Sequence, residues 1–439
     1  MPGTAAGLLY HNDQAGSYPD SWYAASAVIP PPLAALQGRL ETDVCIVGAG
    51  YTGLSAALHL ARSGLRVCVL DAHRVGFGAS GRNGGQVCMG QRLDQLQLEQ
   101  KFGQSHAHQL WDIASDAVSL VRSLVREYRI NCDLQDGIIH ADHRARFLAG
   151  TRAAVDRLQQ DYGQDQIRFL ERDELRALLN SPLYFGGALD LAGAHLHPLN
   201  YALGLARAAR DNGAVIHENS PVLDYQNTAN GVEIRLAGGQ VRASQLILAC
   251  NGYLDRLEPA VARRVLPLNN YMVATEPLSE TAMRALIRER YAVADSRFVV
   301  NYYRFSADRR LLFGGGENYS FRFPADIRAF VRPHLLKVFP QLAEVRLDYG
   351  WGGTLAITVN RMPCFMRPQP NVWSASGYSG HGVAMATMAG RIMAEAIQGT
   401  LERFDIMHEV PMRPFPGGTM LRSPLLVLAM LYYSLRDRL

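Results

Sequence analysis

The sequence lacks several features that would place the protein in other classes. No apolar run approaches the roughly 20 residues needed to cross a bilayer. The beginning of the chain has no basic stretch followed by an apolar one, so we predict no signal peptide. Lysine occurs only at positions 101 and 337, and no basic stripe with interleaved aromatic residues is present. Nucleic-acid binding is therefore not expected.

Cysteine is also scarce, with six residues scattered mostly through apolar segments. They form no CxxC pair and no metal-ligand spacing, so we predict reduced thiols, no metal site and a cytoplasmic location. The chain has 439 residues, of which 48% are hydrophobic and 19% charged. This length exceeds what one hydrophobic core usually organises, so two domains are expected.

A glycine-rich turn between two apolar strands is the most informative feature that is present. Val44 to Val47 leads into Gly48, Gly50 and Gly53, and a helix and second strand then end at Asp71. In such a βαβ unit the first glycine permits a tight turn, the second lets the backbone approach a pyrophosphate, and the third allows close helix packing. A terminal acid accepts hydrogen bonds from a ribose. The predicted dinucleotide contacts here are Gly48, Gly50, Tyr51, Thr52, Gly53, Asp71 and Ala72.

Two further glycine clusters favour a flavin dinucleotide over a nicotinamide one. Residues 76–85 contain too much glycine for a helix or strand and can lay backbone N–H groups against a ligand. Residues 377–382 join a strand to a helix over 383–398, whose N-terminus would stabilise an anionic reduced flavin. The additional predicted contacts are Gly78, Ala79, Ser80, Arg82, Asn83, Gly84, Gly85, Gln86, Val222, Gly252, Gly380, His381, Gly382 and Val383.

These motifs together resemble the D-amino-acid-oxidase superfamily of FAD enzymes, which includes sarcosine and glycine oxidases. The matching stretches are DVCIVGAGYTGLSAALHLA, GFGASGRNGG and GYSGHGVAMATMAGRIMAE. Narrower matches, such as WYAASA, HLHPLN and YYSLRDRL, are most similar to the branch that oxidises gamma-glutamylputrescine. The resemblance implies FAD as cofactor and a primary amine and oxygen as reactants. The products would be an aldehyde, ammonia and hydrogen peroxide.

The expected fold is a two-domain α/β (α+β) arrangement. A Rossmann-like domain with a parallel sheet would bind FAD through residues 41–95, 190–255 and 346–405. A largely antiparallel sheet from 96–189 and 256–345 would cover the flavin and form the substrate domain. The apolar strand 246–250 is predicted beside the first strand. Residues 1–40 would form an extended arm.

The last segment, 406–439, is predicted to be a tail with a short helix over Leu425 to Tyr433. This helix would dock on the protein's own surface or at a subunit interface, so an oligomer is compatible with the sequence. Peripheral membrane contact is the less favoured alternative, because a basic face is suggested only by Arg422 and Arg436.

Four residues are candidates for catalysis, namely Tyr302, Arg304, His381 and Trp351. On a pleated strand Tyr302 and Arg304 share one face and Tyr303 the other. The resemblance implies that Arg304 binds a substrate carboxylate, against the alternative of a structural salt bridge. His381 would contact flavin or substrate, or would serve only as a spacer. His195 and His197 are expected to cap or pack rather than to transfer protons.

Two departures from the related enzymes leave alternatives open. Some sarcosine oxidases bind FAD through a cysteine where this chain has Gly352, Gly353 and Thr354, so we predict non-covalent FAD. The covering strand also has no lysine of the kind that assists oxygen in those relatives. An amino-acid dehydrogenase or oxidase of the same fold, of D-amino-acid, sarcosine or glycine type, is therefore an alternative. A flavin-binding subunit without turnover is another.

Overall fold

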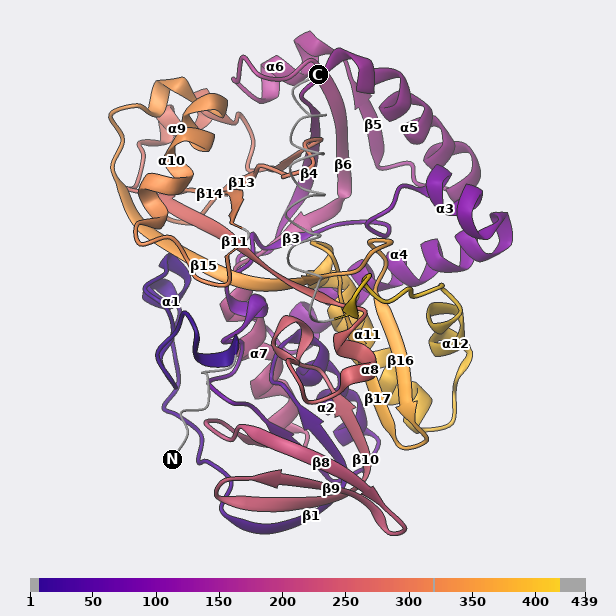
Figure 1. Ribbon diagram of the computed structural model, residues 1–439. Helices are drawn as coiled ribbons and strands as arrows, with labels where there is room; N and C mark the ends of the chain where they lie inside the picture. The colour runs from indigo at the N-terminus through magenta and orange to yellow at the C-terminus, as the bar shows by residue number, and fades with distance from the viewer. Residues whose placement is uncertain (1–7, 319, 419–439) are drawn as a thin grey trace.

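The computed structural model describes residues 8–318 and 320–418, which form two sheets (Figure 1). Residues of both sheets line a cleft. The predicted helix over 425–433 lies outside the described residues. In the part of the chain that is described, no helix is long and apolar enough to cross a membrane.

The first sheet is built mainly from parallel strands. Its order is β16 (Cys364–Gln369), β17 (Val372–Ser376), β10 (Gly239–Leu248), β1 (Gly38–Val47), β2 (Val67–Leu70) and β7 (Val215–His217), with the hairpin of β8 (Val222–Thr228) and β9 (Gly231–Leu236) pairing to β10. Strand β10 runs parallel to β1 along its whole length, which confirms the prediction for strand 246–250. Sequence-distant segments therefore meet in this sheet.

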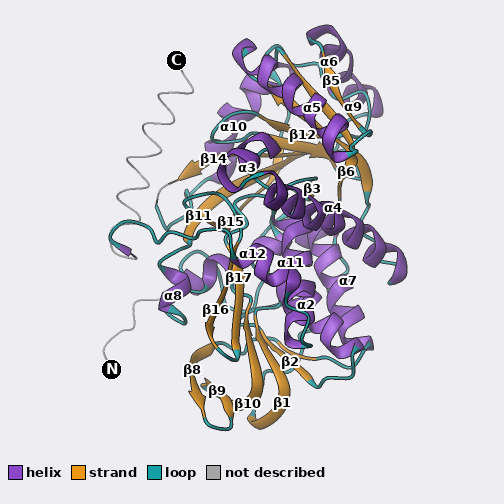
Figure 2. Cartoon of the chain, turned by 90° about the vertical axis from the view of Figure 1, so that its right-hand side faces the viewer, coloured by secondary structure: helices purple, strands orange, loops and turns teal. Residues whose placement is uncertain are grey.

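Helices cover one face of this sheet, and the β8–β9 hairpin lies on the other side (Figure 2). The helices are α2 (Tyr51–Arg62), α7 (Pro198–Asp211), α11 (Gly382–Ile397) and α4 (Gln104–Glu127). α2 and α11 pack so closely that a Cβ on Gly390 would lie 2.3 Å from the Thr52 carbonyl oxygen. This contact packs the first turn of α2 against the middle of α11, and both helices follow glycine turns.

The second sheet is largely antiparallel. Its order is β15 (Leu347–Ile357), β11 (Leu266–Thr275), β14 (Leu311–Asn318), β13 (Tyr302–Phe305), β12 (Ala292–Asp295), β4 (Gln135–Asp142), β6 (Gly186–His195) and β3 (Gln86–Val87), with β5 (Ile167–Leu170) on β6. Its outer face packs against α6 (Arg172–Leu178), α9 (Glu280–Leu286) and α10 (Ile327–Val338). The remaining helices are α1 (Trp22–Ser26), α3 (Gln95–Phe102), α5 (Leu148–Tyr162), α8 (Pro259–Ala262) and α12 (Glu402–His408). The inner face of the sheet looks towards the cleft.

Some local expectations differ from the structure. The periodicity of residues 145–180 predicts helix, but β5 interrupts the helices α5 and α6 because residues 167–170 pair with β6. β15 belongs to the second sheet by its pairing with β11, although residues 346–405 were expected with the first. The division of the chain into domains stays a prediction.

Candidate active site

The cleft lies where both glycine turns and the inner face of the second sheet meet. The predicted residues that line it are Gly50, Tyr51, Thr52, Ala79, Ser80, Arg82, Asn83, Gly84, Gln86, Tyr302, Gly380, His381, Gly382 and Val383. They come from the start of α2, from the loop before β3, from β13 and from the start of α11. The structure therefore brings together four segments, two from the first 90 residues and two from beyond residue 300.

The first glycine turn has the geometry that its sequence predicts. Gly48 has a φ of +109°, which L side chains rarely adopt, and a Cβ there would lie 2.6 Å from the Ala249 carbonyl oxygen. A Cβ on Gly53 would lie 1.9 Å from the Gly48 carbonyl oxygen, so helix and turn can approach only with glycine. At Gly50 the Cβ would be 2.9 Å from Ser80 Oγ. The turn and the second glycine loop thus form one surface.

Asp71 supports this turn from the end of β2. One carboxylate oxygen accepts from the Ala49 N–H at 2.7 Å and the other from the His73 N–H at 2.8 Å. Burial raises the pKa of Asp71 to about 6. The carboxylate keeps lone pairs that a ribose hydroxyl can use.

The other predicted cofactor residues do not line this cleft. Gly78 lies against Tyr253, and Gly85 against the Leu196 carbonyl. Gly252 packs on the Leu355 carbonyl. The set outside the lining is Gly48, Gly53, Asp71, Ala72, Gly78, Gly85, Val222 and Gly252. Their contact with the cofactor stays a prediction.

Tyr302 is the predicted catalytic residue of the covering sheet that does line the cleft. Its hydroxyl donates to Asn270 Oδ1 at 2.5 Å. A Cβ on Gly84 would lie 2.6 Å from the Tyr302 ring, and one on Gly314 would lie 2.1 Å from it. The ring is thus held between two glycines, with one of them on the cofactor loop.

Arg304 lies on the same side of β13 as Tyr302 but does not line the cleft. It is 1% exposed, and its Nε donates to the Gly84 carbonyl at 2.8 Å and its Nη2 to the Leu196 carbonyl at 2.7 Å. Tyr303 points the other way, into the outer core, as strand alternation predicts. The placement of Arg304 differs from the expectation that it faces the substrate. Its guanidinium already donates hydrogen bonds to two backbone carbonyls.

Trp351 is likewise buried and outside the cleft lining. Its Nε1 donates to the Arg82 carbonyl at 3.0 Å, and its ring meets Tyr23 edge-on with 5.1 Å between the centroids. The side chain therefore supports the loop that carries Arg82. A direct catalytic role for Trp351 stays a prediction. In the structure its indole instead contacts the backbone of the loop that carries Arg82.

Two histidines line the cleft, His381 from the start of α11 and His140 from β4. His381 precedes the first turn of α11, and burial together with the charge of Arg92 lowers its pKa to about 3. His140, which sequence reasoning missed, projects from β4, where its neighbours Ile139 and Ala141 point into the outer core. Burial lowers the pKa of His140 as well. Both imidazoles are neutral near pH 7 and can accept a hydrogen bond.

His195 and His197 lie outside the cleft, as their expected capping and packing roles require. His197 precedes α7, and its Nδ1 accepts from the Asn200 N–H at 3.1 Å. Its Nε2 lies 3.0 Å from Ser26 Oγ. His195 is fully buried, and its Nε2 lies 2.6 Å from the Arg290 carbonyl oxygen. The capping prediction for His197 is confirmed.

The charged groups of the cleft were largely missed by sequence reasoning. Arg92 and Arg361 line it, and the Arg361 guanidinium lies 4.9 Å from the Phe298 ring centroid. Asp295 is the one carboxylate among the described lining residues, and its oxygens accept from Asn301 and Arg297. The cleft therefore carries an excess of positive charge.

Residues 43–396 match the model of a family described as FAD dependent oxidoreductase. The chain belongs to this family. It is 43% identical to gamma-glutamylputrescine oxidoreductase of Escherichia coli (strain K12), over 95% of this chain and 98% of that protein. It is 38% identical to the probable oxidoreductase OrdL of Rhizobium meliloti (strain 1021), over 95% and 97% of the two chains.

Solved structures share the fold at lower identity. Glycine oxidase from Geobacillus kaustophilus superposes with a TM-score of 0.71 at 19% identity, covering 82% of this chain and 95% of that one. L-proline dehydrogenase from P. horikoshii gives 0.66 at 18% identity, covering 88% and 96%. The predicted fold class is confirmed, and the family makes FAD the cofactor.

The residues of the cleft fit an FAD-dependent oxidoreductase. Glycines stand where side chains would block the turns, and Arg82 Nη2 is a buried donor without a partner in the described structure. A buried donor without an acceptor is unfavourable, so a ligand oxygen would stabilise it. Residues at the starts of α2 and α11 and in the loop 79–86 would hold the cofactor.

Proposed function

We propose that this FAD-dependent oxidoreductase oxidises the terminal primary amine of gamma-glutamylputrescine or a close gamma-glutamylated polyamine, in the cytoplasm. The observation that carries the proposal is the 43% identity to a gamma-glutamylputrescine oxidoreductase over nearly the whole of both chains. The six cysteines are free, which supports a reducing compartment.

The charge of the cleft supports a substrate that carries a carboxylate. Arg92 and Arg361 supply guanidinium groups, whereas the one lining carboxylate, Asp295, already accepts hydrogen bonds from its neighbours. Free putrescine is a dication at neutral pH and would be repelled, whereas a gamma-glutamyl group adds an anion that arginine can bind through two hydrogen bonds. These two residues replace Arg304 as our candidates for the carboxylate partner.

The overall reaction converts R–CH2–NH2, O2 and H2O into R–CHO, NH3 and H2O2. Bound FAD would supply the acceptor for the hydride equivalent that leaves the carbon bearing nitrogen. The nitrogen lone pair must be free, yet an amine with a pKa of about 10.4 is almost entirely protonated at pH 7. Neutral His381 and His140 add no positive charge beside an amine and can accept its N–H.

FAD is proposed to bind without a covalent link. Cys88 lines the cleft, but burial raises the pKa of its thiol to about 12, so it is not a thiolate nucleophile at neutral pH. Residues 352–354 of β15 contain no cysteine. Oxygen as the electron acceptor is part of the proposal, with a quinone-linked dehydrogenase as the alternative.

Three amines that differ by one group test the substrate. We expect kcat/KM to be at least tenfold higher for gamma-glutamylputrescine than for 4-aminobutyrylputrescine, which lacks only the carboxylate, because one charge-assisted hydrogen bond is worth about 1.5–3 kcal/mol. Free putrescine should be poorer still. Oxygen uptake would measure turnover, and anaerobic flavin bleaching would separate a dehydrogenase from a subunit without turnover.

Arginine variants locate the interaction. Arg92→Gln and Arg361→Gln should reduce the preference for the carboxylate-bearing amine, whereas Arg263→Gln, at an exposed position outside the cleft, should keep it. Equal kcat/KM for all three amines in the unaltered protein would refute the proposed substrate. A normal preference in both cleft variants would refute the proposed carboxylate partners.

A further inference from the structure

We propose that Asp13, on the N-terminal arm, is a positioning residue that aims Arg82 at the cofactor, and that Arg82 Nη2 donates a hydrogen bond to an oxygen of FAD. The arm is defined here as residues 8–37. The sequence predicts residues 1–40 to be an extended arm, and the structure places the short helix α1 within it. The inference concerns cofactor binding and does not depend on which amine is oxidised.

The guanidinium of Arg82 is fixed on three sides. Its Nε donates to the Phe77 carbonyl at 2.7 Å, and its Nη1 donates to Asp13 Oδ1 at 2.9 Å and to the Gly352 carbonyl at 3.1 Å. Its Cζ lies 4.4 Å from the centroid of the Phe77 ring. These contacts determine both the plane and the rotation of the guanidinium.

One donor group of this guanidinium, Nη2, has no hydrogen-bond acceptor among the described residues. Arg82 is 3% exposed, it lines the cleft, and its buried Nη2 has no hydrogen-bond partner among the described residues. A side chain with a purely structural role would be expected to satisfy its buried donors. The geometry therefore points to an acceptor that enters the cleft, and FAD is the family's cofactor.

Asp13 is itself held in place by the residues around it. Asn12 Nδ2 donates to the Phe321 carbonyl at 2.7 Å, and Asn12 Oδ1 accepts from the Phe323 N–H at 2.8 Å. On its other side, the Tyr18 hydroxyl donates to the Val75 carbonyl at 2.7 Å. The arm is thus attached before Asp13 to the loop between β14 and α10, and after Asp13 to Val75, which directly precedes the glycine loop 76–85.

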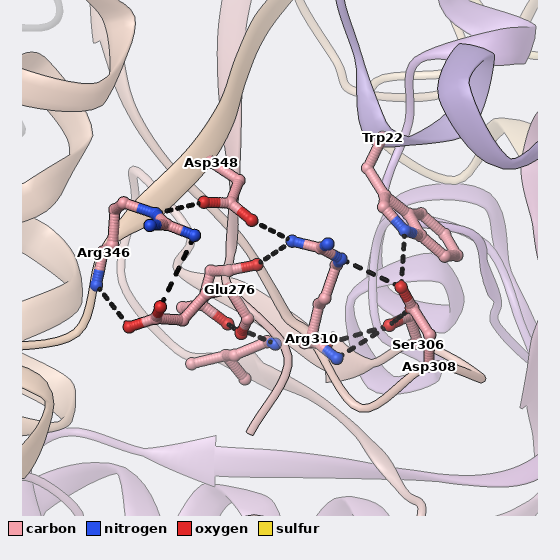
Figure 3. Close-up of polar contacts among 9 residues, drawn as sticks. Trp22, Glu276, Ser306, Asp308, Arg310, Arg346 and Asp348 are labelled. Carbon is pink, nitrogen blue, oxygen red and sulfur yellow. Dashed lines mark hydrogen bonds and ion pairs between the residues drawn. The ribbon is translucent and has the colours of Figure 1, made fainter. Parts of the chain in front are cut away.

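A network of charged residues fixes the next part of the arm. Trp22 Nε1 donates to Asp308 Oδ2 at 3.2 Å, and Arg310 connects Asp308 to Asp348 (Figure 3). Arg346 then joins Asp348 to Glu276. Through the Trp22–Asp308 hydrogen bond, this network connects α1 to β15 and to the residues that flank β11 and β14.

The test measures FAD binding by apoprotein, using the quenching of flavin fluorescence. Asp13→Asn and Arg82→Lys should each raise the Kd for FAD at least tenfold, while the unfolding temperature of the apoprotein stays close to that of the unaltered protein. Asp13→Glu should restore most of the affinity. Asp20→Asn is the matched control, since Asp20 is an exposed acid on the same arm.

Coupling between the two residues distinguishes positioning from general support. If Asp13 acts through Arg82, the double variant should bind FAD no more weakly than Arg82→Lys alone. An unchanged Kd in Asp13→Asn, or effects that multiply in the double variant, would overturn the proposal. If Asp13→Asn apoprotein does not fold, Arg82→Lys decides alone, and an unchanged Kd in that variant overturns the donor role.

Discussion

Arg304 illustrates how a buried charge can be satisfied without a ligand. The sequence suggests a cation next to an aromatic residue on a strand that faces the cofactor, and an arginine in that place could bind a carboxylate. In the folded chain the guanidinium instead donates hydrogen bonds to the carbonyl oxygens of Gly84 and Leu196, at 2.8 and 2.7 Å. Its position behind the cofactor loop makes it a support for that loop.

Removing this guanidinium should weaken the loop rather than substrate binding. Arg304→Ala leaves two buried carbonyls without their donor, so we expect the free energy of unfolding to fall by about 2–5 kcal/mol. Bound flavin should decrease, whereas KM of the remaining holoenzyme should stay within about twofold of the original. Urea unfolding, flavin absorbance and steady-state kinetics measure the three quantities. A large rise in KM with normal flavin content would return Arg304 to the substrate site.

At the scale of elements, the N-termini of helices contribute many of the residues that line or border the cleft. α2 and α11 begin at the cleft, and α7 begins with the His197 cap just outside it. The predicted helix 383–398 is observed as 382–397, and α7 begins at Pro198, directly after His197. Local signals such as Pro198 and Gly399 sufficed for these ends, because capping depends on nearby residues.

The cap of α7 gives a prediction about pH. Burial lowers the pKa of His197 to about 3, whereas an unfolded histidine titrates near 6.5. Between these values the unfolded state binds a proton that the folded state does not, so this residue lowers stability as pH falls below 6.5. The loss is up to about 2 kcal/mol at pH 5.

His197→Asn retains a side chain that can cap the helix but removes the titrating group. We therefore expect a similar unfolding temperature at pH 8 and a smaller loss than the unaltered protein between pH 8 and pH 5. Thermal unfolding at the two pH values would show this. An identical loss in both proteins would mean that other groups, such as His195 and His381, dominate the acid sensitivity.

At the scale of the whole molecule, the cofactor cleft joins the two sheets. Residues of both sheets line it, so FAD should stabilise the assembly as a ligand of the folded state. Removing FAD should lower the unfolding temperature, and FAD at 100 times its Kd should restore about 2.7 kcal/mol.

Acid precipitation provides the matching test of non-covalent attachment, because free FAD would remain in the supernatant. Yellow colour retained in the washed pellet would contradict non-covalent attachment.

Riboflavin serves as a control ligand in the thermal unfolding experiment, since it lacks the pyrophosphate and adenosine for which the first glycine turn is suited. Equal stabilisation by riboflavin would argue against a dinucleotide site.

The sequence by itself determined the features that depend on neighbouring residues. These include the glycine turn at 48–53, the capped helices and the alternation that places Tyr302 and Tyr303 on opposite faces. The residue types at these positions restrict the backbone directly, whatever the rest of the chain does.

Only the tertiary structure decided which side chains share the cleft. His140, Arg92 and Arg361 come from β4, from the loop after β3 and from the turn before β16, and no local pattern marks them as neighbours. The same holds for Asp13, which reaches Arg82 across 69 positions of sequence. Strand pairing and burial place these groups together, and burial lowers the pKa of His140, so their roles follow from the folded chain and not from their spacing.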